Sequence, residues 1–349
     1  MTSSAMIDLT DLDARRQYYE RIDRHHLTPL WEVLGTLVPP TPRSPAQAVL
    51  WRYQQARAYL LEAGGLISAH EAERRVLVLE NPGLRGQSRI TQSLYAGLQL
   101  ILPGEVAPAH RHTQSALRLV LEGEGAYTAV DGERTTMRRG DFIITPAWTF
   151  HDHGNSGTQP VIWLDGLDIP IVQLLDAGFA EKSEQDEQAV TRREGDALAR
   201  YGYNMLPVDF EPQRQDPTKV FVYPYARTQE ALRGITAGDI DPHHGYKLRY
   251  VNPATGGSPM PTIGAAAQLL PAGFETRGCR STDSSIFVCL QGGGVARIGE
   301  TELGFGENDV FVVPSWNELR LQVTCETILF SYSDRPVQRL LGLWREQKA

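Results

Sequence analysis

Three histidines in two short segments are the residues of this 349-residue chain most suited to chemistry. His110 and His112 lie two positions apart after Gly104, and His151 follows Gly140. Residues two positions apart in a strand point to the same face, so His110 and His112 can both project into a barrel interior. An isolated His-x-His pair is common on surface strands, so the prediction depends on the third histidine and the glycine turns. Three neutral imidazoles leave coordination positions of a divalent metal open, which predicts a catalytic metal site.

The segments around these histidines consist of short β-rich runs separated by turn residues. From Arg75 onward, runs such as "LYAGLQLILPG" and "DFIITP" alternate with Gly, Pro and Asp-Gly, and Asp131-Gly132 predicts a hairpin. Residues 11–70 show helix-like spacing, and residues 176–235 are polar and charged. The predicted organisation is an amino-terminal helical arm (1–74), a metal-binding barrel (75–175), a linker and helical segment (176–240) and a second, degenerate barrel (241–349).

The two β-rich stretches are copies of one unit. "LILPGEVAPAH" and "RRGDFIITPAWTFH" in the first correspond to "QLLPAGFETRGC" and "FGENDVFVVPSWNEL" in the second. Gly104 and Gly273 are 169 positions apart, and Asp141 and Asp309 are 168 apart. The repeat predicts an all-β fold class, with two antiparallel jelly-roll β-barrels from an internal duplication and an amino-terminal helical arm.

The second copy lacks the histidine set. Cys279, Ser281 and Leu319 stand where the first copy has its three histidines. Leucine cannot bind a metal, so the second barrel is interpreted as structural, serving packing and oligomerisation. A metal site that includes Cys279 remains the alternative. His243 and His244 are adjacent, would face opposite sides of a strand, and are interpreted as loop or surface residues.

The composition excludes several classes of function. The formal net charge of −8 argues against a nucleic-acid partner, and no apolar run of 18 residues predicts a membrane span. The amino terminus has acidic residues where a signal peptide has a basic-then-apolar pattern: Asp8, Asp11 and Asp13. Three cysteines without CxxC spacing predict reduced thiols in a cytoplasmic protein: Cys279, Cys289 and Cys325.

The two histidine-bearing segments resemble the two motifs of the cupin superfamily, and the duplication resembles a bicupin. The general cupin pattern has a glutamate ligand shortly after His-x-His, where this chain has Ala116 or Leu117. The all-histidine site resembles that of gentisate 1,2-dioxygenases and the related salicylate and 1-hydroxy-2-naphthoate dioxygenases. "ERRVLVLENPGLRGQSRITQSLYAGLQLILPGEVAPAHRHTQSALRLVLEGEGA", "WTFHDHGN", "WLDGLDIP" and "KLRYVNPATGG" are very similar to gentisate dioxygenases, so the resemblance covers nearly the whole chain.

This resemblance implies one Fe(II) per subunit in the first barrel, held by His110, His112 and His151, and a homotetramer. It also implies an oxidoreductase of aromatic catabolism. The enzyme would open gentisate (2,5-dihydroxybenzoate) between the carboxyl-bearing and the adjacent hydroxyl-bearing carbons, incorporating both atoms of O2 to give maleylpyruvate. The alternatives are a dioxygenase of salicylate or 1-hydroxy-2-naphthoate and a non-redox metal-dependent cupin isomerase. A sugar-storage or ligand-sensing bicupin is disfavoured, because the first barrel keeps three histidines and no basic DNA-binding appendage is visible.

Three polar residues are candidates for roles beside the metal. Arg118 lies six positions after His112, and an arginine pairs well with a substrate carboxylate. His153 could bond a substrate oxygen or move a proton, or it could be structural. Asp165 could orient His153 or hold the 5-hydroxyl of the substrate, or it could belong to a turn.

Further candidates concern substrate binding. Gln99 is a polar residue of the neighbouring strand, and Trp148 and Tyr95 could pack against the substrate ring, although core packing would also explain both aromatics. The resemblance favours an arginine from the amino-terminal arm, which Arg74 or Arg75 supplies. The sequence leaves open which of these two faces the pocket.

Overall fold

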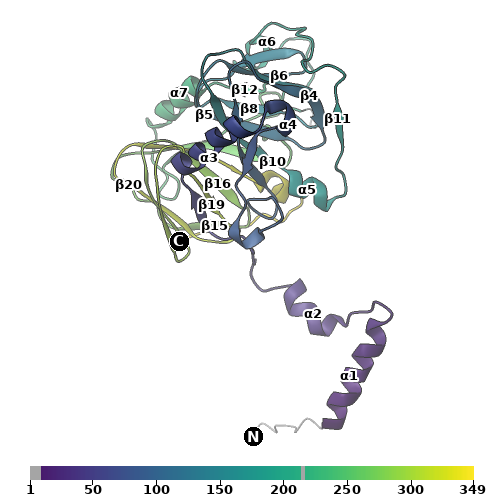
Figure 1. Cartoon of the computed structure of the whole chain (residues 1–349). Coiled ribbons are helices and arrows are strands. Elements are labelled where there is room, and N and C mark those ends of the chain that lie inside the picture. The colour runs from purple at the N-terminus through teal and green to yellow at the C-terminus, as the bar shows by residue number, and fades with distance from the viewer. Residues whose placement is uncertain (1–8, 214–216) are drawn as a thin grey trace. The chain divides into compact units, whose positions relative to one another are not determined.

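The computed structural model describes residues 9–213 and 217–349 (Figure 1), so Asp8 of the acidic amino terminus lies outside the described residues. The chain divides into two compact units, Met1–Arg43 and Ser44–Ala349. The first unit contains α1 (Leu9–Asp23) and α2 (Leu30–Leu37). Tyr19 connects these two helices, because its hydroxyl accepts a hydrogen bond from Trp31 and donates one to Glu32.

The second unit is built from four antiparallel sheets, two for each barrel. The six-stranded sheet of the first barrel has the order β12 (Val222–Tyr223), β8 (Phe142–Thr145), β5 (Ala116–Glu122), β10 (Val161–Leu167), β3 (Tyr95–Ile101), β2 (Val76–Val78). Its five-stranded sheet has the order β11 (Ala180–Lys182), β4 (Val106–His112), β9 (His151–Asn155), β6 (Ala126–Val130), β7 (Glu133–Thr136).

The second barrel repeats this arrangement. Its six-stranded sheet has the order β1 (Val49–Trp51), β19 (Val310–Val313), β16 (Ser285–Gln291), β21 (Thr327–Ser333), β14 (Gly264–Leu270), β13 (Tyr246–Arg249). Its five-stranded sheet has the order β22 (Glu346–Lys348), β15 (Cys279–Ser281), β20 (Leu319–Val323), β17 (Gly294–Ile298), β18 (Thr301–Phe305). The two barrels match strand for strand, so the predicted duplication and the all-β class are confirmed.

Short helices connect the strands of the second unit. They are α3 (Tyr53–Leu66), α4 (Ala69–Ala72), the 3-10 helix η1 (Pro82–Leu84), α5 (Ile169–Leu174), α6 (Asp196–Tyr201), α7 (Tyr225–Ile235) and α8 (Arg335–Leu340). The predicted hairpin joins β6 to β7, with Asp131 and Gly132 both at positive φ (48° and 77°). That conformation suits the Asp-Gly pair, because glycine adopts it at no steric cost.

The first barrel includes two strands, β11 and β12, from outside its predicted range, and the second barrel includes one, β1. β1 lies in the predicted helical arm but pairs with β19, and β12 lies in the predicted linker but pairs with β8. The repeated aspartates explain both placements. Asp309 accepts a hydrogen bond from the backbone N–H of Tyr53 (2.8 Å), and Asp141 accepts one from Tyr225 (2.9 Å). The segments that begin α3 and α7 are therefore equivalent, and the predicted boundary at residue 74 leaves β1, a strand of the second barrel, within the predicted arm.

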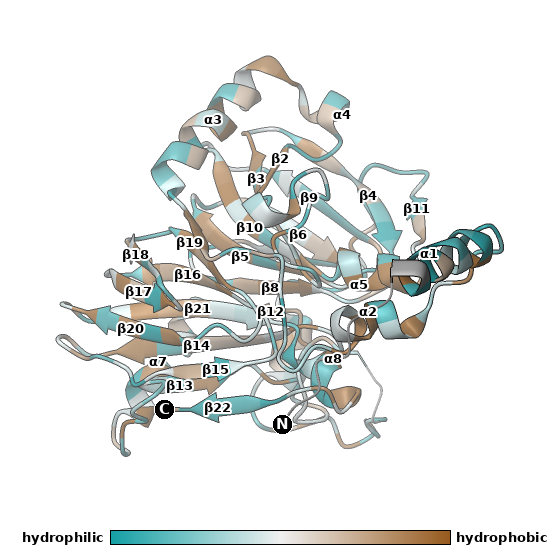
Figure 2. Ribbon diagram, turned by 90° about the horizontal axis from the view of Figure 1, so that it is seen from below, coloured by the Kyte–Doolittle hydropathy of each residue, from teal (hydrophilic) through white to brown (hydrophobic). Residues whose placement is uncertain are grey.

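The largest buried cluster lies between the two six-stranded sheets. It joins side chains such as Leu98 and Leu119 of the first barrel to Val288 of the second, and the rings of Phe142 and Phe330 are 5.3 Å apart. In Figure 2, β16 and β19 are coloured as hydrophobic, whereas β4 and β22 are coloured as hydrophilic. β4 and β22 belong to the five-stranded sheets, so polar side chains gather on strands away from this interface.

The helices and the cysteines were compared with the requirements for a membrane span and for disulfide bonds. None of the helices in residues 9–213 and 217–349 combines the length and apolar character that a membrane crossing requires. Cys279, Cys289 and Cys325 are free thiols, with no disulfide between them.

Candidate metal centre

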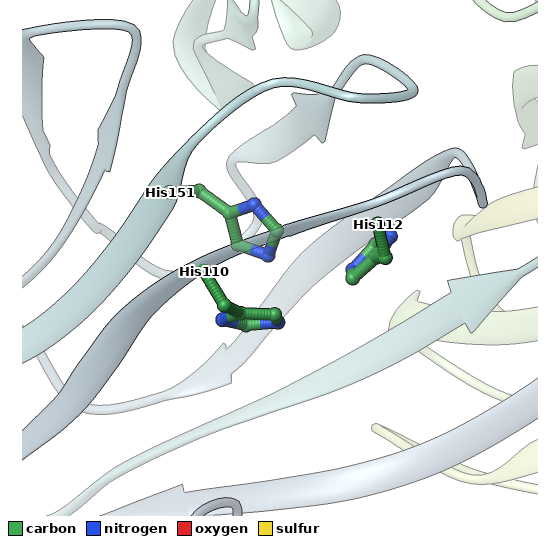
Figure 3. A group of neighbouring side chains, drawn as sticks. All are labelled: His110, His112 and His151. Carbon is green, nitrogen blue, oxygen red and sulfur yellow. The ribbon is translucent and has the colours of Figure 1, made fainter. Parts of the chain in front are cut away.

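The three predicted histidines meet inside the first barrel (Figure 3). His110 and His112 lie on β4, and His151 opens β9 directly opposite His110. The ring of His151 is 4.3 Å from that of His110 and 4.9 Å from that of His112, between ring centroids. One nitrogen from each ring lies within 4.8 Å of the other two. The strand pairing therefore brings together two segments about 40 positions apart in the sequence.

Backbone carbonyl groups orient all three rings. The Nδ1 atoms lie 3.2 Å from the carbonyl oxygen of Pro108 for His110, 2.8 Å from that of Gln114 for His112 and 2.9 Å from that of Thr149 for His151. A ring that donates from Nδ1 has its Nε2 lone pair free for a metal. His151 Nε2 is buried and has no hydrogen-bond partner among the described residues. An orphaned acceptor of this kind fits a site that binds a metal.

The surroundings keep the three imidazoles neutral. Burial, followed by the charge of Arg74, lowers the pKa of His110 to about 3. Burial also lowers the pKa of His112, and it lowers that of His151 well below the ordinary value. Neutral imidazole is the form that binds metals, so the cluster is ready to bind one near neutral pH.

Arg74 and Arg75 have different partners. The Nη2 atom of Arg74 lies 2.7 Å from the Pro108 carbonyl oxygen and 2.6 Å from Nδ1 of His110. A metal on Nε2 requires the proton on Nδ1, and Arg74 could then no longer donate to this ring. Burial lowers the pKa of Arg74 to about 10, which leaves it a cation. Arg75 instead forms a buried ion pair with Glu105 (2.7 Å). Of the two arginines, only Arg74 contacts a histidine of the cluster.

Arg118 lies on the inward face of the six-stranded sheet. It is opposite Asp165 in the pairing of β5 with β10, and its Nη1 atom donates to Thr145 Oγ1 at 2.6 Å. Arg118 is only 4% exposed, and its Nε lies 3.6 Å from Asp165 Oδ1. Burial raises the pKa of Asp165 to about 6, and this carboxylate also accepts a hydrogen bond from Trp163 Nε1 (2.9 Å). The partners of Asp165 are thus Arg118 and Trp163.

His153 is the fourth imidazole of the site. It is buried on β9, its ring is 5.8 Å from that of His151, and its Nδ1 lies 2.9 Å from Thr128 Oγ1. Burial lowers its pKa well below the ordinary value, so it is neutral. Gln99 is buried on β3, opposite Trp163 and two positions from Gly97, which faces Asp165. Gln99 therefore shares the inward face with Asp165.

The two aromatic candidates differ in their surroundings. Tyr95 begins β3 on this same face and is half-buried, and burial raises its pKa. Trp148 is 41% exposed in the turn before β9 and contacts Arg111 and Phe179. The structure therefore brings Tyr95, but not Trp148, into the barrel interior.

Three residues that contact the predicted site residues were not predicted from the sequence: Thr128, Thr145 and Trp163. The two threonines hold His153 and Arg118, and Trp163 holds Asp165. Each lies on a different strand from the residue it contacts, except Trp163, which is two positions before Asp165. Only that period-two spacing could have indicated a partner in advance.

Comparison with known proteins identifies the family. The cupin domain model matches residues 97–167. Gentisate 1,2-dioxygenase 1 of Aquipseudomonas alcaligenes is 54% identical to this chain over 335 residues, which cover 96% of each of the two chains. A gentisate 1,2-dioxygenase of Streptomyces sp. is 36% identical over 98% of this chain and 99% of its own length. A solved structure of salicylate 1,2-dioxygenase from Pseudoaminobacter salicylatoxidans with gentisate has a TM-score of 0.92 at 34% identity, covering 100% of this chain and 97% of that one. The chain therefore belongs to the gentisate 1,2-dioxygenase family of ring-cleaving bicupin enzymes.

Proposed function

We propose that this protein is an Fe(II)-dependent dioxygenase that opens the ring of gentisate between its carboxyl-bearing and adjacent hydroxyl-bearing carbons to give maleylpyruvate. The observation that carries the proposal is the buried cluster of His110, His112 and His151 beside two arginines, Arg74 and Arg118. The histidines offer three neutral donors to one metal. The arginines offer positive charge to an aromatic carboxylate.

The three histidines would hold the iron. When bound, Fe(II) supplies the electron transfer between an electron-rich ring and O2 that spin-paired organic groups cannot perform alone. Three neutral ligands leave the full charge of the ion uncompensated, which favours anionic oxygen donors of the substrate. The carbonyl groups that accept from each Nδ1 hold the rings in place and make the ligands more basic.

Arg118 and Arg74 would bind and orient the substrate. Arg118 is rigid, because Thr145 and Asp165 hold its guanidinium on the barrel's inward face. Its buried Nε has no hydrogen-bond partner among the described residues and could take a carboxylate oxygen. Gln99 and Tyr95 are the further substrate contacts that we propose. Of the other two residues predicted to bind substrate, Arg75 is already paired with Glu105, and Trp148 lies outside the barrel interior.

His153 is the proposed catalytic residue, and Asp165, the second residue predicted to be catalytic, is proposed to act through Arg118. His153 is held by Thr128 beside His151, so it could bond a substrate oxygen or move a proton. Asp165 would act mainly by holding Arg118, since its recorded contacts are with Arg118 and Trp163. This assignment makes Asp165 a positioning residue.

Salicylate or 1-hydroxy-2-naphthoate is the alternative substrate. A salicylate dioxygenase with gentisate is among the proteins similar in structure to this chain, so the fold accommodates both ring types in the family. Gentisate carries a second hydroxyl para to the first, which makes its ring more electron-rich. We therefore expect kcat/KM to be highest for gentisate.

Reconstitution tests the function directly. Chelator-treated enzyme is loaded anaerobically with Fe(II) and mixed with air and gentisate, while oxygen uptake and the absorbance of the enol-pyruvate product are recorded together. Equal consumption of oxygen and gentisate is the expected result, and Zn(II) in place of iron is the control. Oxygen uptake with salicylate but not with gentisate would make salicylate the substrate. No oxygen uptake with gentisate, salicylate or 1-hydroxy-2-naphthoate would favour a non-redox cupin.

Self-association is also proposed, as a homotetramer in the cytoplasm. Leu174 and Leu175 at the end of α5, and the neighbouring Phe179, are largely exposed, as are Leu340 and Leu341 at the end of α8. Exposed apolar side chains of this size gather at subunit interfaces. Light scattering on the eluting protein would measure the mass, and a single-chain mass would refute the assembly.

A further inference from the structure

The second barrel contains a polar cavity at the position that corresponds to the three histidines of the first. Cys279 on β15 lies opposite Leu319 on β20, just as His110 lies opposite His151. β22 runs beside β15 as β11 runs beside β4, so Glu346 pairs with Ser281 on the neighbouring strand. The last strand of the chain thereby brings a carboxylate to a barrel that has lost its histidines.

Three potential metal ligands meet at this cavity: His244 and Cys279 line it, and Glu346 lies next to them. One donor atom from each lies within 4.8 Å of the other two, and Cys279 Sγ is 3.8 Å from Glu346 Oε1. Tetrahedral zinc with ordinary bond lengths separates a sulfur and an oxygen ligand by about 3.6 Å. The observed separation therefore needs almost no adjustment to accept the ion.

The backbone around His244 is fixed. Its N–H donates to Asp241 Oδ1 (2.9 Å), and its carbonyl oxygen accepts from Gln268 Nε2 (2.6 Å). The residue predicted to be an ordinary loop histidine is thus half-buried and faces the cavity. Gln268 is the counterpart of Gln99 in the first barrel, 169 positions earlier. The second barrel keeps this interior glutamine although it has lost the histidines.

Gln268 provides an independent indication that the cavity holds a ligand. The side chain is 2% exposed, and its Oε1 has no hydrogen-bond partner in residues 9–213 and 217–349. The cavity that it lines has a volume of about 50 Å³. A water molecule occupies about 30 Å³ in the liquid, so one water fits. A water bound to a metal could donate to this orphaned acceptor.

The charges of the cavity are compatible with a dication. Arg335 is already paired with Asp283 (3.2 Å). The other lysine or arginine side chain that lines the cavity is Lys247, whose ammonium group is 5.3 Å from the centre of the Phe287 ring. Burial raises the pKa of the Cys279 thiol, which donates to Glu346, so metal binding must release the thiol proton. The resulting thiolate and the Glu346 carboxylate then supply two negative charges against the one positive charge of Lys247. The donor set therefore retains net negative charge for a cation.

We propose that His244, Cys279 and Glu346 form a second metal site, selective for Zn²⁺, with a water as the fourth ligand. Thiolate, imidazole and carboxylate are the three side-chain donors that zinc combines in proteins, whereas the first barrel offers imidazoles alone. The two barrels would thus bind different metals because their ligands differ. The bound ion would fasten β22 to β15 and to the turn at residues 241–245.

Protection of the thiol tests this site in the complete, iron-loaded protein. Cys279 and the exposed Cys325 are alkylated with iodoacetamide with and without Zn²⁺, and each is quantified by mass spectrometry of its peptide. The expected result is that Zn²⁺ slows alkylation of Cys279 at least about tenfold and leaves Cys325 unchanged. Equal alkylation of Cys279 with saturating Zn²⁺ would overturn the proposal, as would protection by phosphate but not by zinc.

Variants separate the site from a general effect on folding. Glu346→Gln keeps the size of the side chain and should weaken Zn²⁺ binding about tenfold or more, with iron content and dioxygenase activity retained. Glu302→Gln on β18, an exposed residue paired with Arg297, is the matched control and should bind Zn²⁺ as the unchanged protein does. His244→Gln is the second ligand variant, and it tests the site even where a third variant, Cys279→Ser, does not fold. Unchanged zinc affinity in both Glu346→Gln and His244→Gln would refute the assignment.

Discussion

The Nε atom of Arg118 lies 3.6 Å from Oδ1 of Asp165, and both side chains are almost completely buried in the first barrel. Asp165 is also held by Trp163, whereas Arg118 Nε has no hydrogen-bond partner among the described residues. A buried cation in this arrangement has charge and donors left for a second carboxylate. The relationship indicates how the substrate's carboxyl group would be recognised.

Replacing Arg118 by alanine should raise KM for gentisate roughly 10- to 100-fold, because a hydrogen bond to a charged group contributes about 1.5–3 kcal/mol. Steady-state kinetics measures this, with the melting temperature recorded to verify folding. Arg134→Ala is the control, since Arg134 pairs with Glu187 at the surface. An unchanged KM in folded Arg118→Ala would exclude Arg118 from substrate binding.

Asp165→Asn should change KM more than kcat. The amide oxygen can still accept from Trp163, but the negative charge beside Arg118 is lost. We expect kcat to stay within about threefold, while KM shifts because the orientation of Arg118 depends on that charge. A loss of kcat of about 100-fold or more with unchanged KM would instead assign Asp165 a direct part in proton transfer.

Arg74→Ala and Arg75→Ala should have opposite consequences. Arg74 is proposed to bind the substrate's carboxylate beside His110, so its loss should raise KM and leave the melting temperature nearly unchanged. Arg75 forms a buried ion pair with Glu105, and breaking such a pair costs about 3–5 kcal/mol. Arg75→Ala should therefore melt several degrees lower while keeping kcat/KM at temperatures where it is folded. A lower melting temperature for Arg74→Ala and a higher KM for Arg75→Ala would instead assign the structural role to Arg74 and substrate binding to Arg75.

His153→Gln should retain iron but lose about 100-fold or more in kcat, as expected when a positioned acid–base group is removed. Thr128→Val is the companion variant, because it removes only the hydroxyl that contacts His153 Nδ1. A smaller loss of kcat is expected there. Full activity in His153→Gln would show that this histidine is structural.

His110→Ala, His112→Ala and His151→Ala should each abolish iron binding and turnover, because two imidazoles hold the ion too weakly. Iron per chain is measured by elemental analysis after desalting, and oxygen uptake by electrode. His25→Ala, an exposed residue in the first unit, is the control. A variant of the three that keeps stoichiometric iron would remove that residue from the ligand set.

The duplication and the histidine cluster could be predicted from the amino-acid sequence alone. Landmarks such as Asp141 and Asp309 repeat at nearly constant separation, and His110 and His112 share a face because the side-chain period of a strand is two. These are local or periodic features, which need no knowledge of which strands pair. The lack of a glutamate near Ala116 was apparent through the resemblance to the cupin motif.

The pairing of the strands, and with it the remaining contacts of the site, could not be predicted from the sequence and became apparent in the folded structure. Arg74 and Arg75 are neighbours in sequence, and the strand register determined which reached His110. The pairing of β1 with β19 and of β22 with β15 joins segments far apart in the chain, which brought Glu346 to Cys279. Such contacts depend on which distant strands bury their apolar faces together, and no local pattern encodes that choice.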